Sequence, residues 1–257
     1  MNDRNAEPPY TLAATIILMR ETFDGPPELL MIERAASMAF AAGALVFPGG
    51  RVEASDWQIA DALDCHLFTR EETAQRIAAI RETIEEAGIA VGLDPLPDAA
   101  TLMALRDGLA AGLSFDILLR QAGCRPAPEV LAPFARWRPV GEIARKFDTR
   151  FYLAAAPSDA AEVADGTESV RAVWGTARNL LDDAEAGLHH VIFPTWCNLD
   201  RLAQFDSLEE AVADGARHAH HIASGRIERR DDMEWLCIDD GIGYPTTAQL
   251  FDKRLRG

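Results

Sequence analysis

Apolar residues in the N-terminal part of the chain occur in short runs bounded by turn-forming residues. Residues 12–19 (LAATIILM) are apolar and partly β-branched, and residues 28–33 (ELLMIE) follow a connection that contains two prolines. Runs of this length and composition predict buried strands, and the proline-containing connection predicts a hairpin between them. A further apolar run, residues 44–47, ends at a proline and two glycines (48–50). The pattern therefore predicts a hairpin and a short extended segment that leads into a double-glycine bend.

Beyond the two glycines, the apolar residues take the spacing of helices. Residues 57–69 and 71–88 carry apolar side chains three and four positions apart, which is the period of an amphipathic helix. Thr69, with Glu72 three residues later, is the predicted N-cap of the second helix. Gly88 is the residue predicted to end that helix, because glycine readily adopts the left-handed conformation of a helix end.

The remainder of the chain mixes both patterns. It predicts helices at residues 99–111, 115–122, 177–186, 195–205 and 208–224, and strands at residues 135–139, 147–155, 169–174 and 234–238. A chain of 257 residues is long enough to bury a sizeable core. We expect one α/β (α+β) domain over residues 1–257, with helical insertions at about 54–70 and 97–128 and a C-terminal helical extension from about 206.

Charge and cysteine content exclude several classes of function. The chain has 25 Lys and Arg against 41 Asp and Glu, a net charge of −16, so its surface repels nucleic-acid backbones and no nucleic-acid partner is expected. Its four cysteines form no CxxC pair, which favours reduced thiols over a disulfide framework or zinc site. No apolar stretch is long enough to span a bilayer, and the N-terminus lacks the basic region of a secretory signal. A cytoplasmic protein without a membrane partner is expected.

Three carboxylates cluster near the end of the second helix. Glu82, Glu85 and Glu86 are three and four residues apart, so they share one helical face, where like charges repel. A bound cation removes that cost, and oxygen ligands favour Mg²⁺ or Mn²⁺. Arg81 is spaced to reach Glu85 and hold its orientation. A solvated acidic face is the alternative that these carboxylates alone leave open.

The double-glycine bend and the carboxylate helix together resemble the signature of the Nudix family, GX5EX7REUXEEXGU, in which U is aliphatic. Residues 81–89 match its second half except that Thr83 replaces the aliphatic residue. The spacing between Gly50 and Arg81 is 17 residues longer than in the signature. The first glutamate of the signature falls on Asp56 when counted from Gly50, and on Thr73 when counted back from Arg81. Glu71 and Glu72 are further candidates for that role.

An upstream segment is similar to the acyl-coenzyme A diphosphatase-like branch of this family, whose coenzyme A motif reads RSX3RX3GX3FPGG. Arg34, Gly43 and residues 47–50 match that motif. Ala35 and Ala39 stand where it has serine and arginine. The whole resemblance covers about residues 10–205.

The resemblance implies an α/β/α sandwich with a mixed sheet and an added helical insertion. It also implies metal-dependent hydrolysis of a diphosphate bond in a nucleoside-diphosphate-linked small molecule, with coenzyme A or acyl-coenzyme A as candidate substrates. Mg²⁺ or Mn²⁺ would be held by Glu82, Glu85, Glu86 and the carbonyl of Gly50. Glu82, assisted by Arg81 and Glu85, would form the catalytic group.

The resemblance also marks residues for the substrate and leaves alternatives open. Arg34, Gly49, Gly50 and Arg51 would bind it, and Glu168 is a further candidate carboxylate. A catalytically silent Nudix fold that binds a ligand or regulates a partner is the main alternative, and a nucleic-acid cap-removing enzyme fits the charge least. The helical block at residues 99–122 is a candidate lid or homodimer interface.

Overall fold

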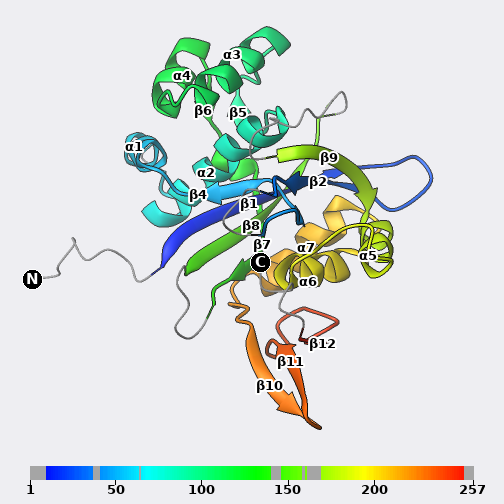
Figure 1. Ribbon diagram of the computed structural model, residues 1–257. Helices are drawn as coiled ribbons and strands as arrows, with labels where there is room; N and C mark the ends of the chain where they lie inside the picture. The colour runs from blue at the N-terminus through cyan, green and yellow to red at the C-terminus, as the bar shows by residue number, and fades with distance from the viewer. Residues whose placement is uncertain are drawn as a thin grey trace, which may run out of the picture.

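The computed structural model describes residues 10–36, 41–63, 65–139, 146–157, 160 and 169–251, and Figure 1 shows how their elements are arranged. The strands are β1 (Thr11–Arg20), β2 (Glu28–Arg34), β3 (Leu45–Val46), β4 (Gly49–Arg51), β5 (Leu93–Asp94), β6 (Arg125–Pro126), β7 (Ala132–Trp137), β8 (Phe147–Ala155), β9 (Ser169–Thr176), β10 (Arg226–Arg230), β11 (Met233–Cys237) and β12 (Ala248–Leu250). The helices are α1 (Ala54–Ala62), α2 (Arg70–Ala87), α3 (Ala99–Ala110), α4 (Phe115–Ala122), α5 (Ala177–Glu185), α6 (Phe193–Leu202) and α7 (Leu208–His218), with a 3-10 turn at Pro128–Val130.

A mixed sheet forms the centre of the molecule. In the described part of the chain it has seven strands, with β3-β2-β1-β8-β7 in sequence across it, β4 paired with β1 and β9 paired with β2. β1 and β8 run parallel, whereas β1 pairs antiparallel with β2 and with β4. The predicted hairpin between the first two strands is therefore confirmed, and the double-glycine segment itself joins the sheet as β4.

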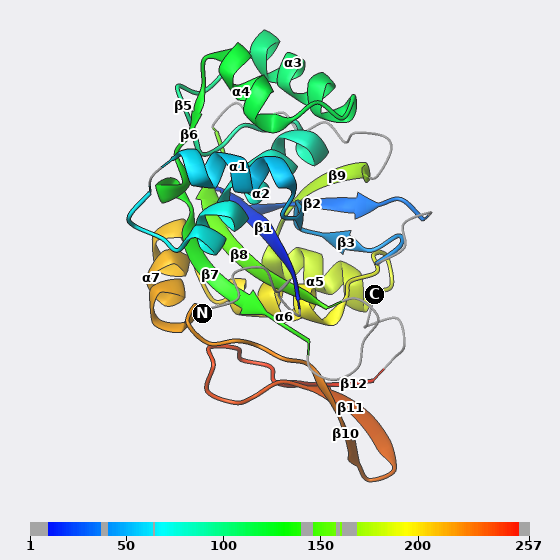
Figure 2. The same cartoon turned by 90° about the vertical axis from the view of Figure 1, so that its left-hand side faces the viewer.

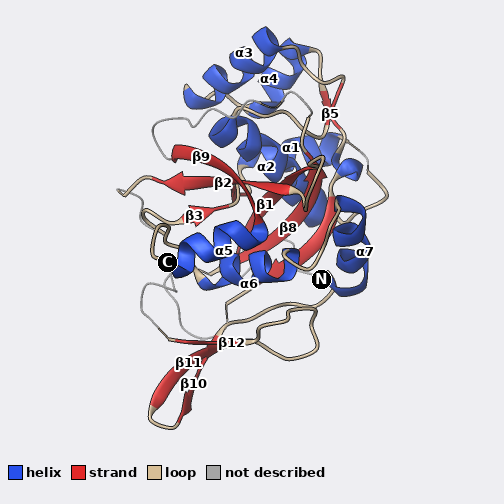
Figure 3. Cartoon of the chain, turned by 90° about the vertical axis from the view of Figure 1, so that its right-hand side faces the viewer, coloured by secondary structure: helices blue, strands red, loops and turns tan. Residues whose placement is uncertain are grey.

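The central strand β1 is covered on both faces, which explains its nearly continuous apolar sequence. Because successive side chains of a strand point to opposite faces, Ile16 and Leu18 pack in one core cluster with residues of α2, while Ile17 and Met19 pack in a second cluster with residues of α5 and α6. The sheet lies between α1–α2 and α5–α6 (Figure 3). The predicted α/β/α sandwich with a mixed sheet is confirmed.

Further elements extend this sandwich at both ends (Figure 2). Helices α3 and α4 occupy the stretch for which we predicted a helical insertion, and they add Leu105, Leu109 and Phe115 to the core cluster of α2. Beyond the opposite layer, β10, β11 and β12 form a separate three-stranded sheet. Neither addition interrupts the central strands.

The C-terminal part differs from the helical extension predicted from about residue 206. Helix α7 ends at His218 rather than at 224, because Ala223 pairs with the end of β7: its N–H donates to the Arg136 carbonyl at 2.8 Å. A hairpin of β10 and β11 follows. Its turn residues, Asp231 and Asp232, have φ values of 49° and 62°, the left-handed conformations that tight hairpin turns require.

Other element ends shift by a few residues from their predicted positions. The first helix after the glycines covers Ala54–Ala62 instead of 57–69, since Thr69 already serves as the N-cap of the next helix. That N-cap is confirmed, because the Thr69 side chain accepts a hydrogen bond from the Glu72 N–H. Gly88 ends α2 with φ 66°, as predicted. Helix α6 begins at Phe193, two residues before its predicted start.

The side chain of Arg76 on α2 connects that helix to the segment before β7. Arg76 is 2% exposed, and its guanidinium donates to the carbonyls of Pro128 and Leu131 and to the Glu72 carboxylate. Removing one member of a buried charged network leaves its partners unsatisfied. We therefore expect Arg76→Ala to lower the free energy of unfolding by about 3–5 kcal/mol, measured by urea denaturation.

The matched control for this prediction is Arg125→Ala. The Arg125 side chain is 76% exposed and pairs with Asp94 at the surface, where ion pairs stabilise by about 0–1 kcal/mol. Equal losses for the two variants would contradict a structural role for the buried Arg76 network.

Candidate active site

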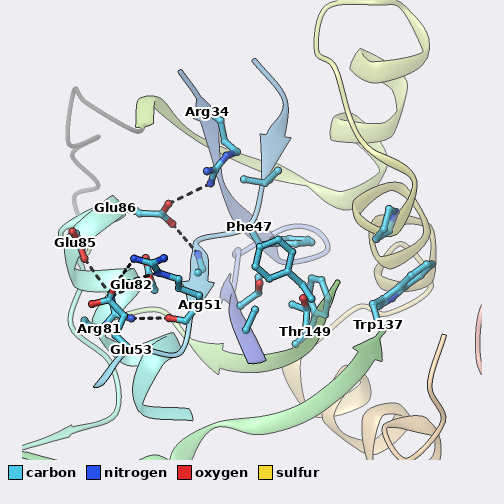
Figure 4. A pocket seen from close by; sticks show the side chains of 18 of the residues that line it. Arg34, Phe47, Arg51, Glu53, Arg81, Glu82, Glu85, Glu86, Trp137 and Thr149 are labelled. Carbon is cyan, nitrogen blue, oxygen red and sulfur yellow. Dashed lines mark hydrogen bonds and ion pairs between the residues drawn. The ribbon is translucent and has the colours of Figure 1, made fainter. Parts of the chain in front are cut away.

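The end of α2 lies directly against the double-glycine bend, and Figure 4 shows the side chains between them. The N–H of Gly49 donates to Oε2 of Glu86 at 2.8 Å. A Cβ atom placed on Gly50 would lie 2.2 Å from Oε1 of Glu82. Glu86 is 3% exposed. These two carboxylates therefore face the bend. The alternative of a solvated acidic face would require them to face bulk solvent.

Arg81 organises the carboxylates around it. Its Nε and Nη2 donate to the two carboxylate oxygens of Asp56 at 3.1 and 3.0 Å, and its Nη1 donates to Glu82 at 2.9 Å and to Glu85 at 3.4 Å. Its Nη2 also donates to the carbonyl of Arg51 at 2.9 Å. The predicted contact of Arg81 with Glu85 is present, but Arg81 lies closer to Asp56 and Glu82.

Burial and the neighbouring charges shift the pKa values of this group. Burial raises the pKa of Asp56 above its ordinary value, and the Arg81 guanidinium opposes that rise. Burial lowers the pKa of Arg81, but Glu82 and Asp56 together raise it by more, so Arg81 stays charged. Burial and the nearby charge of Glu85 raise the pKa of Glu82 to about 7, although the Arg81 guanidinium acts to lower it. A carboxyl that gains and loses a proton near neutral pH is suited to accepting a proton or to binding a cation.

The carboxylates line one end of a cavity of about 910 Å³. Its other end is apolar, and its lining there includes Phe47, Phe151, Trp137, Phe193 and Leu236. The turn between α3 and α4 also lines the cavity. The cavity therefore joins a charged end to an aromatic end, and it is larger than a diphosphate group alone would need.

The indole of Trp137 is fixed in the aromatic wall by the C-terminal part of the chain. Its Nε1 donates to the hydroxyl of Tyr244 at 2.7 Å, and that hydroxyl donates to Oδ1 of Asn198 at 3.0 Å. Phe193 packs edge-on against the same indole, with the ring centroids 6.0 Å apart. Residues from α6, β7 and the segment after β11 thus build this wall together.

The residues predicted to bind substrate all line the cavity. Arg34 lies with Nη1 3.7 Å from Oε1 of Glu86, and its buried Nε has no hydrogen-bond partner among the described residues. The side chain of Arg51 is 69% exposed and pairs with Glu53 at 3.4 Å. Gly49 and Gly50 form the bend itself. Glu168 and Ala39 lie outside the described residues.

Comparison with known proteins identifies relatives of this chain. No protein-family model matches the chain. Acyl-coenzyme A diphosphatase NUDT19 of Xenopus laevis is 26% identical over 233 residues, covering 71% of this chain and 61% of that protein. The protein of the same description from Gallus gallus is 27% identical over 71% of this chain and 63% of its own length. The chain thus spans about six-tenths of the length of these relatives.

A solved structure extends the similarity to the fold. A NUDIX hydrolase from Alicyclobacillus acidocaldarius superposes with a TM-score of 0.64 and 25% identity, covering 81% of this chain and 97% of that structure. The chain resembles the Nudix hydrolases in both sequence and fold. Its Nudix motif is divided between the bend at Gly49-Gly50 and the last turns of α2, and the fold brings the two parts into contact.

The geometry indicates which residue stands at the first acidic position of the divided Nudix motif. Asp56 lies six positions after Gly50, is fully buried and binds Arg81 through both carboxylate oxygens. Of the two further candidates, Glu72 instead pairs with Arg76 at 2.9 Å, and Glu71 is exposed. The extra 17 residues therefore form the end of α1, the connection and the start of α2, and they leave the pairing of Asp56 with Arg81 possible.

The donor set of this Nudix site fits a hard divalent cation in its chemistry. Carboxylate oxygens and backbone carbonyls are the ligands that Mg²⁺ and Mn²⁺ prefer, and the absence of a Cβ at Gly50 leaves space beside Glu82. Among the described residues, no three His, Cys, Asp or Glu side chains converge on one point. Glu82 and Glu85 instead turn toward Arg81. Binding an ion would therefore require rotation of these side chains.

Several residues of the Nudix site carried no signal in the sequence. Tyr244 lies 107 positions from Trp137, and no local pattern pairs the two. Arg106 on α3 contacts the end of α2, a tertiary contact that helical periodicity does not reveal.

Within the described residues, no helix has the length and apolar character needed to cross a membrane.

Proposed function

We propose that this Nudix chain hydrolyses a diphosphate bond in a nucleoside-diphosphate-linked small molecule, with Mg²⁺ or Mn²⁺ as cofactor. The observation that carries the proposal is the contact between the two parts of the motif, Gly49 N–H to Glu86 at 2.8 Å. This contact sets three carboxylates at one end of a cavity large enough for an organic substrate.

The residues of α2 would divide the chemical work. Glu85, Glu86 and the carbonyl of Gly50 would hold the cation, which when bound neutralises the diphosphate and makes a water molecule more acidic. Glu82, with a pKa near 7, would accept the proton of the attacking water. Arg81, held by Asp56, would keep Glu82 and Glu85 at the same side of the cavity.

Arg34 would bind a phosphate oxygen of the substrate. Its Nε is buried and has no hydrogen-bond acceptor among the described residues. Guanidinium groups bind phosphates through two parallel hydrogen bonds. Such local positive charge matters in a chain with a net charge of −16, because the overall field repels a polyanion.

Coenzyme A or acyl-coenzyme A is the substrate class that we favour. The two relatives named above are described as acyl-coenzyme A diphosphatases, and Arg34, Gly43 and residues 47–50 match the coenzyme A motif. The aromatic end of the cavity offers space for a group attached beyond the diphosphate. Ala35, which replaces the serine of the motif, is buried.

A catalytically silent Nudix fold remains the second candidate, since the motif is divided and Thr83 replaces its aliphatic residue. However, Thr83 is fully buried and its hydroxyl donates to the Ala79 carbonyl one turn earlier in α2. That substitution is accommodated inside the helix and leaves the carboxylate face unchanged. The enzymatic proposal therefore has the stronger support.

A substrate screen with and without metal tests the two candidates. We expect turnover of coenzyme A, an acyl-coenzyme A, ADP-ribose or a dinucleotide with Mg²⁺ or Mn²⁺, and at least about 100-fold slower turnover in EDTA, because the ion supplies both charge neutralisation and an acidic water. Products are separated by chromatography. Metal-independent turnover would contradict the proposed chemistry, and ligand binding without turnover over the whole panel would favour the silent fold.

A further inference from the structure

The insertion helix α3 contacts the main chain of the proposed metal ligands. Arg106 on α3 donates from Nε to the carbonyl of Glu85 at 3.1 Å and from Nη2 to the carbonyl of Glu86 at 3.4 Å. Both bonds reach the backbone, so the carboxylates of these residues stay available to the cavity. One guanidinium thus joins two adjacent peptide groups at the end of α2.

The packing of α3 explains why Arg106 lies there. Leu105 and Leu109, on either side of it in the sequence, are 2% and 7% exposed and belong to the same core cluster as Ile84 and Ala87 of α2. Their burial directs α3 across the end of α2. At the crossing point, a Cβ on Gly88 would lie 3.0 Å from Nη1 of Arg106. The glycine that ends the motif helix therefore also leaves room for the guanidinium.

The end of α2 has an electrostatic and a hydrogen-bonding need that Arg106 meets. The last four carbonyls of a helix lack intrahelical donors, and the C-terminus carries the negative end of the helix dipole. Glu82, Glu85 and Glu86 add negative charge at this end, and α2 has no basic residue in its last turn. Arg106 brings both N–H donors and a positive charge to it from another helix.

We propose that Arg106 is a positioning residue that fixes the last turn of α2, and with it Glu85 and Glu86, for cation binding. This inference rests on the proposed function. Partners that hold metal ligands in place typically contribute about 10–100-fold to metal affinity or activity. The helical insertion would therefore contribute to the site by holding the residues that bind the cation. The same insertion lines the cavity through Leu113 and Phe115.

The proposal is tested by measuring Mn²⁺ binding to the full chain. The signal of free Mn²⁺ in electron paramagnetic resonance reports how much of the ion is bound. Arg106→Gln is expected to bind Mn²⁺ about 10-fold more weakly than the unmodified chain. Arg106→Lys keeps the charge but cannot donate from two fixed N–H groups, so an intermediate affinity is expected. The matched control is Arg120→Gln on α4, whose side chain is 69% exposed and pairs with Asp116; its Mn²⁺ affinity is expected to be unchanged.

Thermal unfolding of the same variants separates positioning from simple stabilisation. A lower melting temperature for Arg106→Gln with unchanged Mn²⁺ affinity would overturn the proposal. Tighter Mn²⁺ binding by Arg106→Gln would also overturn it, because the charge of Arg106 would then act only by repelling the ion. If Arg106→Gln does not fold, equal affinities of Arg106→Lys and the unmodified chain would overturn it. Failure of the unmodified chain to bind Mn²⁺ would overturn the proposed function as well, so the two failures are distinguishable.

Discussion

Replacing Glu86 with glutamine is expected to reduce diphosphate hydrolysis by about 1,000-fold or more, because loss of even the groups surrounding metal ligands costs about 10–100-fold. Glu86 is 3% exposed, and it is the carboxylate that connects α2 to the double-glycine bend. Glutamine has nearly the same shape, and its side-chain oxygen still accepts the hydrogen bond from Gly49. The substitution therefore removes the charge while the contact between the two motif parts persists.

Turnover, Mn²⁺ affinity and unfolding in urea should be measured together on this variant. We expect both turnover and affinity to fall while the midpoint of unfolding changes little. Glu71→Gln is the matched control, since the Glu71 side chain is exposed in the first turn of the same helix and is remote in sequence from the carboxylate cluster. Full activity of Glu86→Gln would contradict the assignment of Glu86 as a metal ligand.

Those features of the site that depend on local spacing could be predicted from the sequence. The common face of Glu82, Glu85 and Glu86 follows from helical periodicity alone, and the ends of α2 follow from Thr69 and Gly88. The strand character of residues 12–19 likewise follows from their apolar composition. In each of these cases, a few neighbouring residues contain the physical cause.

Features that depend on tertiary contact could not be predicted in this way. The sequence left Asp56, Glu71 and Glu72 as competing candidates. Only the fold shows that Asp56 is the partner of Arg81, while Glu72 pairs with Arg76 and Glu71 is exposed. The predicted end of α7 is wrong because the partner of Ala223, the end of β7, lies far away in sequence. Helical pattern alone could not show that α7 stops to make this contact.

Substitution by alanine is expected to have different effects at the two adjacent glycines of the bend: a loss of stability at Gly49 and a loss of turnover at Gly50. A Cβ on Gly49 would lie 2.4 Å from the carbonyl oxygen of Ala14 and 2.7 Å from Cα of Thr15. These are backbone atoms of β1, the central strand, which has helices on both faces and cannot move aside. Gly49→Ala should therefore lower the free energy of unfolding by about 3 kcal/mol, the upper part of the range for overpacked positions.

At Gly50 the obstacle is a side chain. A Cβ there would meet Oε1 of Glu82 at 2.2 Å and Cδ at 2.4 Å, and the end of a glutamate side chain can rotate away. Gly50→Ala should therefore fold with nearly unchanged stability but displace Glu82 from the cavity. A misplaced reacting group costs about 100-fold in rate, so we expect a loss of turnover of that size.

Urea denaturation and turnover measured on both variants separate the two effects. Gly25→Ala is the matched control, because among the described residues a Cβ there would approach only the Thr22 hydroxyl, at an ordinary 3.7 Å, and it should change neither quantity. If Gly50→Ala kept full turnover, Glu82 would be no part of the chemistry, and the proton acceptor would have to be sought among the other carboxylates of the cavity. If Gly49→Ala were as stable as Gly25→Ala, the close approach of the bend to β1 would be wrong, and with it the contact that brings Glu86 to the glycines.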